Sequence, residues 1–203
     1  MIHTWLADVS ALHNEDTYQR YYAQVPQFRK EKADHLQLQE DKALSVGAWI
    51  LLEQMKKEYG LQEHAVFNIS HSGTYALCSV DTSEMPEREV GCDLELIKKD
   101  RRGMAERYFC SDECAMIHTK EDFYRFWVLK ESFVKAIRIG MKLPMDSYEF
   151  TFSAEGRPYL KRQPERFPKT YYFKEYEVEG LEYKIAVCAD CDAFASDIKI
   201  MKL

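Results

Sequence analysis

The sequence predicts an α+β protein built as a pseudo-twofold pair of similar lobes, each a helix packed on a small, mainly antiparallel sheet. Each half of the 203-residue chain contains a helical repeat of apolar residues followed by short strand-like runs with polar turns between them. The length and a hydrophobic fraction of 46% suffice for one large domain or two small lobes. We place the lobes at residues 1–100 and 101–203.

The first lobe opens with a strand predicted at residues 2–8, "IHTWLAD". Residues 40–59 carry apolar side chains at helical spacing, and Gly60 closes this predicted helix. Three strands follow, in "AVFNIS" (65–70), "TYALCSV" (74–80) and "REVGCDLELI" (88–97).

The second lobe repeats this order of elements. Ser111 can cap a short helix, and Thr119 with Asp122 resembles a capping box for a longer helix at about 120–138. Four strand-like runs then follow, at 147–153, 157–162, 170–178 and 182–189. The lobes join near "IKKDRRGM", at residues 97–104.

Charge and hydropathy exclude several classes of protein. A net charge of −6 argues against a general nucleic-acid-binding surface. No apolar segment approaches the roughly 20 residues that cross a bilayer, and the first residues lack the pattern of a signal peptide. We therefore expect a cytoplasmic protein that binds no membrane and keeps its six cysteines reduced.

Two cysteine pairs raise the alternative of a zinc site. Cys188 and Cys191 have zinc-ligand spacing, and Cys110 and Cys114 lie four residues apart. Cys188, however, continues the apolar alternation of its strand, and two other cysteines sit inside apolar runs. Buried free thiols are therefore the favoured interpretation.

The stretch "VGCDLELI" combines strand character with two acidic residues. Alternation puts Asp93 and Glu95 on one face beside Gly91, which has no side chain to obstruct a ligand, and leaves the other face as core. Adjacent like charges favour a cationic ligand there. A solvated edge strand would give the same pattern.

The predicted helix at 120–138 contains "FWVLKESFVKAIRIGM". Its apolar side has ordinary core spacing, with Phe126, Leu129, Phe133 and Ile137. Trp127, Glu131 and Lys135 follow at four-residue steps on another face. Taken alone, Glu131 and Lys135 could form an ordinary surface ion pair.

Three segments together resemble a known family. "FNISHSG", "VGCDLEL" and "FWVLKESFVKA" resemble, in this order, the signature segments of the 4'-phosphopantetheinyl transferases. The resemblance extends from about residue 27 to 190. It includes "AERYFCSDE" and "KLPMDSYEF". The length is similar to that of the two-lobed, surfactin-synthetase-activating type, which implies a monomer rather than the trimers of the shorter holo-(acyl-carrier-protein) synthase type.

The resemblance implies a reaction and its cofactor. The family transfers the 4'-phosphopantetheine arm of coenzyme A to a serine of an apo acyl or peptidyl carrier protein, leaving adenosine 3',5'-bisphosphate. Mg²⁺, which prefers hard oxygen ligands, would be held by Asp93, Glu95 and Glu131. The type leans toward the carriers of nonribosomal peptide and polyketide synthesis.

The resemblance also implies catalytic and coenzyme A-binding residues. Glu131 would accept the serine proton, and Lys135 would neutralise the phosphates or protonate the leaving group. His71 would hydrogen-bond a phosphate oxygen, Ser70 would hold the nucleotide, and Lys130 would contact phosphate from the next helix face. Trp127 would only support the packing of the helix.

The 3'-phosphate of coenzyme A needs cations of its own. In "QFRKEKADH", Arg29 and Lys32 best match the basic positions of the family, with Lys30 as a possible substitute. Family members commonly carry a "GKP"-like segment before the N-x-S-H motif. This chain has "EYGLQEHAVFNISHS" instead, without that lysine before Asn68.

An acidic carrier protein requires a basic docking surface. The best candidates follow the acidic strand directly, at Lys98, Lys99, Arg101 and Arg102, although a basic linker between lobes would look the same. Two other functions stay open: a metal-dependent phosphohydrolase that acts on coenzyme A-like pyrophosphates with the same carboxylates, and a non-catalytic carrier-binding homologue.

Overall fold

The computed structural model describes residues 1–203, apart from the side chain of Met141. Contacts divide the chain into two compact units: unit 1 comprises Met1–Pro86 with Ala195–Leu203, and unit 2 comprises Glu87–Phe194. These units differ from the expected lobes at 1–100 and 101–203, because the acidic strand pairs within unit 2 and a last strand pairs within unit 1. Both units combine helices with mainly antiparallel sheets, so the α+β class is confirmed.

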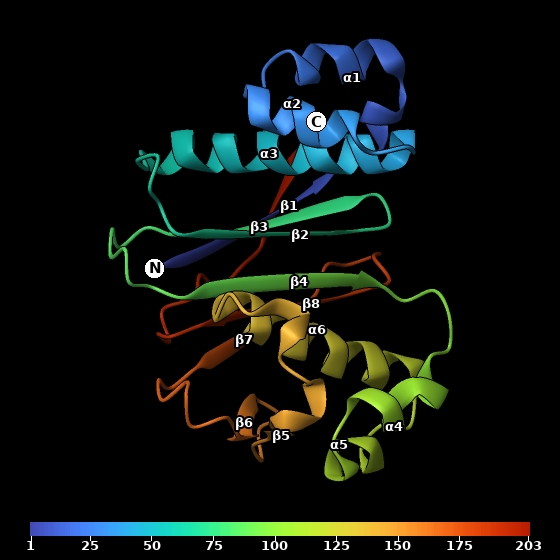
Figure 1. Ribbon diagram of the computed structural model, residues 1–203, viewed down its shortest axis with the longest axis vertical. Helices are drawn as coiled ribbons and strands as arrows, with labels where there is room; N and C mark the ends of the chain where they lie inside the picture. Colours follow the sequence, from blue (N-terminus) through green and yellow to red (C-terminus); the bar gives the residue numbers. More distant parts are fainter. The chain divides into compact units, whose positions relative to one another are not determined.

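Unit 1 is a long helix on a four-stranded sheet with the order β2-β3-β1-β9. Its pairs are antiparallel except for β9, which joins β1 in parallel. In Figure 1, α3 lies between this sheet and the two short helices α1 and α2. Its elements are β1 (Ile2–Asp8), α1 (Glu15–Tyr22), α2 (Gln27–Asp34), α3 (Gln39–Tyr59), β2 (Phe67–Ser72), β3 (Tyr75–Asp81) and β9 (Lys199–Lys202), with a 3-10 turn at Ser10–His13.

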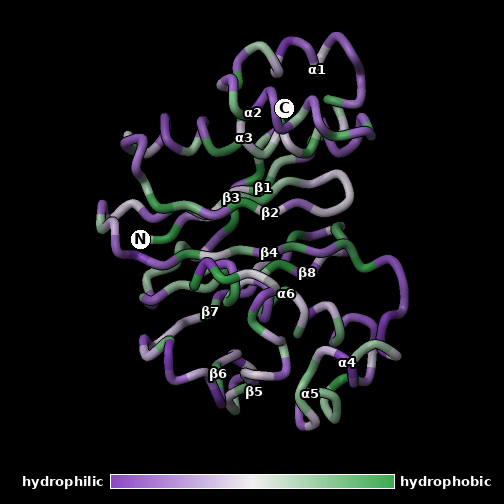
Figure 2. Tube along the Cα trace, viewed as in Figure 1, coloured by the Kyte–Doolittle hydropathy of each residue, from purple (hydrophilic) through white to green (hydrophobic). Residues whose placement is uncertain are grey.

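Helix α3 forms where the apolar repeat predicts it. It ends at Gly60, whose φ of 64° lies in the left-handed region that glycine adopts without strain. Leu51, Leu52 and Met55 of α3 share a buried core with Ala76 and Cys78 of β3. Figure 2 shows the contrast between this core and the surface of unit 1: β1 and β3 are largely hydrophobic, whereas α1 is mainly hydrophilic.

Unit 2 packs the second long helix on a three-stranded antiparallel sheet with the order β4-β8-β7. Helix α6 contacts β4 and β8 (Figure 1), and a separate hairpin joins β5 to β6. The elements are β4 (Val90–Leu96), α4 (Ala105–Tyr108), α5 (Ser111–Ala115), α6 (Lys120–Ala136), β5 (Glu149–Phe152), β6 (Pro158–Arg162), β7 (Tyr172–Tyr176) and β8 (Tyr183–Ala189). Three 3-10 turns lie at Arg102–Met104, Gly140–Lys142 and Met145–Ser147.

The caps of the unit 2 helices agree only in part with the prediction. The capping box of α6 is confirmed: the Thr119 Oγ1 accepts from the Asp122 backbone N–H at 3.1 Å, and Asp122 Oδ2 accepts from the Thr119 N–H at 2.8 Å. The helix ends at Ala136 rather than 138, because Arg138 has a φ of 57°. Ser111 does not cap α5. Cys110 precedes this helix instead, and its N–H donates to Glu113 Oε2 at 2.8 Å.

All six cysteines are free thiols, and Cys78, Cys92 and Cys188 are buried. Of the helices that the structure describes, none combines the length and apolar character needed to cross a membrane.

Candidate active site

The acidic residues of β4 face helix α6. A Cβ added at Gly91 would lie 2.1 Å from the Ser132 carbonyl oxygen and 2.3 Å from the Ala136 nitrogen. Glycine is therefore required here because the backbone of α6 packs directly on β4. This corrects the expectation that Gly91 leaves space for a ligand: the space is filled by the helix. Asp93, two residues on, faces the same helix.

Asp93 and Lys135 form an ion pair between β4 and α6. Lys135 Nζ lies 2.5 Å from Asp93 Oδ1, and the side chains are 25% and 5% exposed, respectively. Burial alone would lower the pKa of Lys135, but the charge of Asp93 and its hydrogen bond raise that pKa above its ordinary value. The lysine is therefore held as a cation at the edge of a largely buried site.

Glu131 is half-buried one helical turn before Lys135. Burial raises the pKa of Glu131, and the negative charges of Asp93 and Glu95 raise it further, while Lys135 opposes the shift. Its Oε1 is buried and has no hydrogen-bond partner among the residues that the structure describes. Three carboxylates thus influence one another electrostatically, with Lys135 as their neighbouring cation.

This donor set fits a hard divalent cation better than it fits the protein alone. Carboxylate oxygens are the ligands that Mg²⁺ prefers, and an unpartnered buried carboxylate oxygen on Glu131 is costly without a cation. Within the described part of the chain, no group of three or more His, Cys, Asp or Glu side chains is gathered as a metal site. Asp93 Oδ1 is paired with Lys135 instead.

Lys130 does not have the position expected of a phosphate ligand. Its side chain is 0% exposed, and its Nζ lies 2.9 Å from Glu113 Oε1. The same Nζ donates to the carbonyl oxygens of Met145 at 2.7 Å and Tyr148 at 2.8 Å. The ammonium group is enclosed by protein acceptors, so a role in phosphate binding is contradicted.

Glu113, which sequence reasoning missed, completes this buried network. Its Oε1 also accepts from the Phe150 N–H at 2.7 Å, and its Oε2 accepts from the Cys110 N–H. The network ties α5 and the start of β5 to α6, beside Glu131. Helical spacing could have indicated that Lys130 is buried, because this lysine lies four residues after Phe126 and three before Phe133, on the apolar face of the helix.

Trp127 packs among aromatic rings, as expected of a supporting residue. Its ring lies 5.9 Å from that of Phe123 and 5.5 Å from that of Tyr108, between centroids.

Two further candidate residues of unit 1 lie on β2. His71 is exposed near the end of the strand and pairs in register with Ala76, whereas Ser70 is buried and pairs with Leu77. Phe67 and Ile69 of the same strand pack against the core beneath α3.

The early basic cluster forms helix α2 of unit 1. Lys32 is exposed, whereas Arg29 is half-buried with its Cζ 4.5 Å from the centroid of the Trp49 ring. Arg29 Nε is buried without a hydrogen-bond partner among the described residues. Lys30 contacts the end of α1, with its Nζ 5.5 Å from the Tyr22 ring centroid.

Comparison with known proteins agrees with the sequence motifs. Residues 89–188, which include all three carboxylates and Lys135, match the family model of the 4'-phosphopantetheinyl transferase superfamily. The chain belongs to this superfamily. Arg29, Lys32, Ser70 and His71 lie outside the matched segment.

Two curated 4'-phosphopantetheinyl transferases illustrate the relationship. The chain is 34% identical to ffp of Bacillus subtilis over 144 residues, which cover 68% of this chain and 61% of the relative. It is 31% identical to gsp of Aneurinibacillus migulanus over 159 residues, which cover 73% and 62%. The chain thus spans about three fifths of the length of these 4'-phosphopantetheinyl transferases.

Among solved structures, the holo-[acyl-carrier-protein] synthase of Helicobacter pylori in complex with coenzyme A matches with a TM-score of 0.43 and 18% identity. The match covers 49% of this chain and 96% of that one.

Proposed function

We propose that this chain transfers 4'-phosphopantetheine from coenzyme A to a serine of an apo carrier protein, giving the holo carrier protein and adenosine 3',5'-bisphosphate. The observation that carries the proposal is the group of Asp93, Glu95, Glu131 and Lys135, which interact electrostatically within the segment that matches the superfamily. The curated relatives named above are transferases of this kind.

The chemistry follows from the charges of this group. The serine Oγ forms a bond to the phosphorus that bears the pantetheine arm, and the bond from that phosphorus to the bridging oxygen breaks. Glu131 takes the serine proton, a role favoured by its raised pKa and by an oxygen without a protein donor. Lys135, a cation with a raised pKa, neutralises the charge that develops on the departing phosphate.

The proposal includes Mg²⁺ held by Asp93, Glu95 and Glu131, where the bound ion would neutralise charge on the pyrophosphate oxygens. Lys135 pairs with Asp93 Oδ1, so the lysine and a bound ion would share this carboxylate.

Residues of unit 1 are proposed to bind other parts of coenzyme A. Arg29 and Lys32, three residues apart on α2, would bind the 3'-phosphate, which needs cationic donors. His71 would donate to a phosphate oxygen, for which its exposure on β2 is suitable, and Ser70 would contribute to nucleotide binding. Lys130 has no part in this proposal, because it is enclosed.

The basic segment after β4 is proposed to dock an acidic carrier protein. Lys98, Lys99, Arg101 and Arg102 are all exposed. Arg102 is already paired with Asp100 at 2.7 Å and donates to the His118 carbonyl oxygen, which leaves the other three as the better candidates. We expect the enzyme to act as a cytoplasmic monomer on carriers of peptide or polyketide synthesis.

An intact-mass assay tests the reaction. The protein, coenzyme A and Mg²⁺ are mixed with a panel of apo carrier proteins, and Glu131→Ala and metal-free mixtures serve as controls. The expected result is a gain of one phosphopantetheine mass on at least one carrier, lost in both controls. Tyr159→Ala, an exposed substitution in unit 2 far along the sequence from these residues, should transfer at the native rate.

Two other outcomes would replace the proposal. Release of adenosine 3',5'-bisphosphate without any carrier would indicate a phosphohydrolase. Coenzyme A binding without transfer to any carrier would indicate a non-catalytic homologue.

A further inference from the structure

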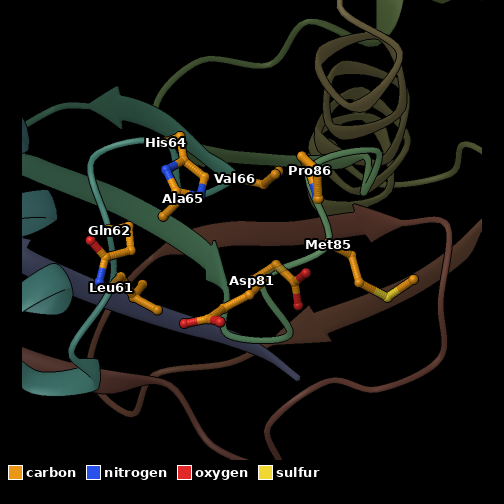
Figure 3. A pocket seen from close by; sticks show the side chains of 9 residues that line it. Leu61, Gln62, His64, Ala65, Val66, Asp81, Met85 and Pro86 are labelled. Atoms are coloured by element: carbon orange, nitrogen blue, oxygen red, sulfur yellow. The ribbon is translucent and has the colours of Figure 1, made fainter.

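The small cavity of unit 1 in Figure 3 does not provide a further binding site. It lies between the 61–66 segment and the 81–86 segment, where Leu61, Val66 and Met85 contribute to its walls. Its volume of about 20 Å³ accommodates about one water molecule. A further partner is therefore better sought at the charged surface of unit 2.

The basic segment that follows β4, residues 97–102, presents three exposed cations. Lys98, Lys99 and Arg101 form no ion pair with any residue that the structure describes, and we refer to them as the cation trio. Cations this close along a chain repel one another, and a mobile loop would let them separate. The segment is nevertheless attached to the rest of unit 2 in its middle and at both ends.

Tyr124 of α6 holds the middle of the basic segment. Its side chain is only 2% exposed, and its hydroxyl donates to the Lys99 carbonyl oxygen at 3.2 Å. The guanidinium of Arg101 lies over the same ring, with its Cζ 5.9 Å from the centroid. A buried tyrosine hydroxyl needs an acceptor, and here the acceptor is the backbone of an exposed loop. Tyr124 thus fixes the backbone and leaves the ammonium group of Lys99 in solvent.

The two ends of the basic segment are fixed as well. At its start, the N–H of the buried Ile97 donates to the Glu182 carbonyl oxygen at 2.9 Å. At its end, Arg102 donates to the His118 carbonyl oxygen and to Asp100 Oδ2, each at 2.7 Å. The hydrogen bonds from Arg102 lower the pKa of Asp100 to about 2, so this carboxylate stays ionised and paired at neutral pH.

Helix α6 relates the basic segment to the group proposed to react. Asp93 of β4 meets Lys135, and six residues later Lys99 meets Tyr124, which lies eleven residues earlier in the helix. The strand and the segment after it therefore run antiparallel to α6. Tyr124 and Glu131 are seven residues apart, which places them on nearly the same helix face with a rise of about 10 Å between them. The helix thus sets the distance from the basic segment to the carboxylate.

We propose that Tyr124 is a positioning residue for the carrier protein: acting through the Lys99 backbone, it presents the cation trio to an acidic carrier surface at a set distance from Glu131. The inference rests on the proposed function for the identity of the partner. Charges that are already fixed lose less conformational freedom on binding than charges on a mobile loop. Tyr124 therefore acts on recognition of the carrier and not on binding of coenzyme A.

Limited digestion with trypsin, which cleaves after lysine and arginine, tests the attachment without any carrier. Tyr124→Phe keeps the buried ring and removes only the hydroxyl, so cleavage within residues 98–102 should become about fivefold faster. Tyr171→Phe is the matched control, because Tyr171 is also buried in unit 2 and its hydroxyl donates to Glu89 instead. This control should be cleaved there at the native rate. Mass spectrometry identifies the first cuts.

Transfer kinetics test the role in recognition. Tyr124→Phe should raise KM for the carrier about fivefold at low salt, with KM for coenzyme A and kcat near their native values. Tyr171→Phe should leave both KM values unchanged. Because the attraction is between charges, about 0.5 M NaCl should raise the carrier KM of the native protein and abolish its difference from Tyr124→Phe. A purely structural tyrosine would change both KM values together at any salt concentration.

The outcomes separate this inference from the proposed function. Transfer by the native protein, with an unchanged carrier KM in Tyr124→Phe, would overturn the inference and leave the function standing. An equal rise in both KM values, or native-like cleavage of Tyr124→Phe by trypsin, would reduce Tyr124 to a packing residue. If the native protein modifies no carrier of the panel, the proposed function fails and the inference fails with it.

Discussion

Helix α6 carries two lysine–carboxylate pairs that differ in how completely they are enclosed. Lys130 and Glu113 are both 0% exposed, and their charged atoms are 2.9 Å apart. Four backbone groups complete the hydrogen bonds of this pair: two carbonyl oxygens accept from Lys130, and two N–H groups donate to Glu113. Lys135 and Asp93 are 2.5 Å apart, with a quarter of the lysine side chain exposed. The two lysines are separated by little more than one helical turn.

This difference separates a structural pair from one that can change partners. An ammonium that is enclosed by fixed acceptors cannot leave without exposing a buried charge, so Lys130 can only hold α5 and β5 to the helix. Lys135 sits among three interacting carboxylates, with a quarter of its side chain exposed, so under the proposed function it can exchange Asp93 for a phosphate. Both pairs join a lysine to a carboxylate, and the difference in burial decides which pair is structural and which can change partners.

The largest expected effect is the loss of transfer activity when Glu131, on the same helix face as Lys135, is replaced. Glu131→Gln should lower the rate of carrier modification roughly 10²–10⁴-fold, because the group proposed to accept the serine proton is lost. Single-turnover intact-mass measurements determine this rate. A rate within tenfold of the native value would remove Glu131 from the role of base.

The same substitution should stabilise the metal-free protein at neutral pH. The pKa of Glu131 is raised by burial and by Asp93 and Glu95, so its ionised form is disfavoured in the folded state. Gln removes that penalty at pH 7. The gain in free energy of unfolding should vanish below the ordinary pKa of 4.5, where both states are protonated. Urea unfolding at the two pH values measures it.

On the structural side, Lys130→Met should destabilise the fold by roughly 3–5 kcal/mol, because Glu113 is left buried and unpaired. Adding Glu113→Leu should recover most of the loss, since an apolar pair carries no desolvation penalty. Urea denaturation of both variants checks this. Lys161→Met, at an exposed lysine paired with Asp112 and Glu149, is the control and should cost much less. Equal stabilities of the single and double variants would mean that the buried pair does not act as a unit.

Packing between the helix and β4 sets the position of both pairs. Gly91→Ala should cost roughly 1–3 kcal/mol or more, because its Cβ would overlap backbone atoms of Ser132 and Ala136 that cannot rotate away. Gly103→Ala, whose Cβ meets no atom within 4 Å, is the control and should be nearly neutral. Thermal unfolding compares the two. Similar melting temperatures would show that α6 can shift without penalty.

The smallest expected effect concerns competition at Asp93. Lys135→Met removes the cation that occupies Asp93 Oδ1, so the affinity for Mg²⁺ should rise about tenfold, or about 1.4 kcal/mol. Transfer should fall nevertheless. Calorimetric titration with Mg²⁺ measures the affinity, and an unchanged value would mean that Lys135 and the metal do not compete.

Sequence patterns predicted the elements that carry strong periodicity. The first strand, α3 and α6 lie within two residues of their predicted bounds, because alternation, helical spacing and the capping box are local signals. Helices α1 and α2 were missed because they bury little, with Tyr18 and Ala33 as their buried residues. Strand β9 was missed because its partner β1 lies nearly the whole chain away.

The sequence indicated which residues form the candidate site, but not how the neighbouring elements pack around them. The spacing of the motifs indicated Asp93, Glu131 and Lys135, but not which face of β4 the helix covers. That choice depends on Gly91, whose tertiary contact with α6 leaves no local signal. The expected phosphate contact of Lys130 was wrong because a lysine in a functional motif is expected to be exposed to solvent. Its buried partner Glu113 lies 17 residues away in the sequence, so no local pattern indicates the pair.

The pairing of β1 with β9 has a consequence for the order of folding during synthesis. Residues 5–8 align with residues 199–202, so the whole of unit 2 leaves the ribosome before the sheet of unit 1 can receive its fourth strand. Closing so long a loop is entropically costly and slow. Unit 2 is continuous in sequence and has no such requirement. The carboxylate-bearing half can therefore reach its folded state while a nascent unit 1 still exposes the edge of β1.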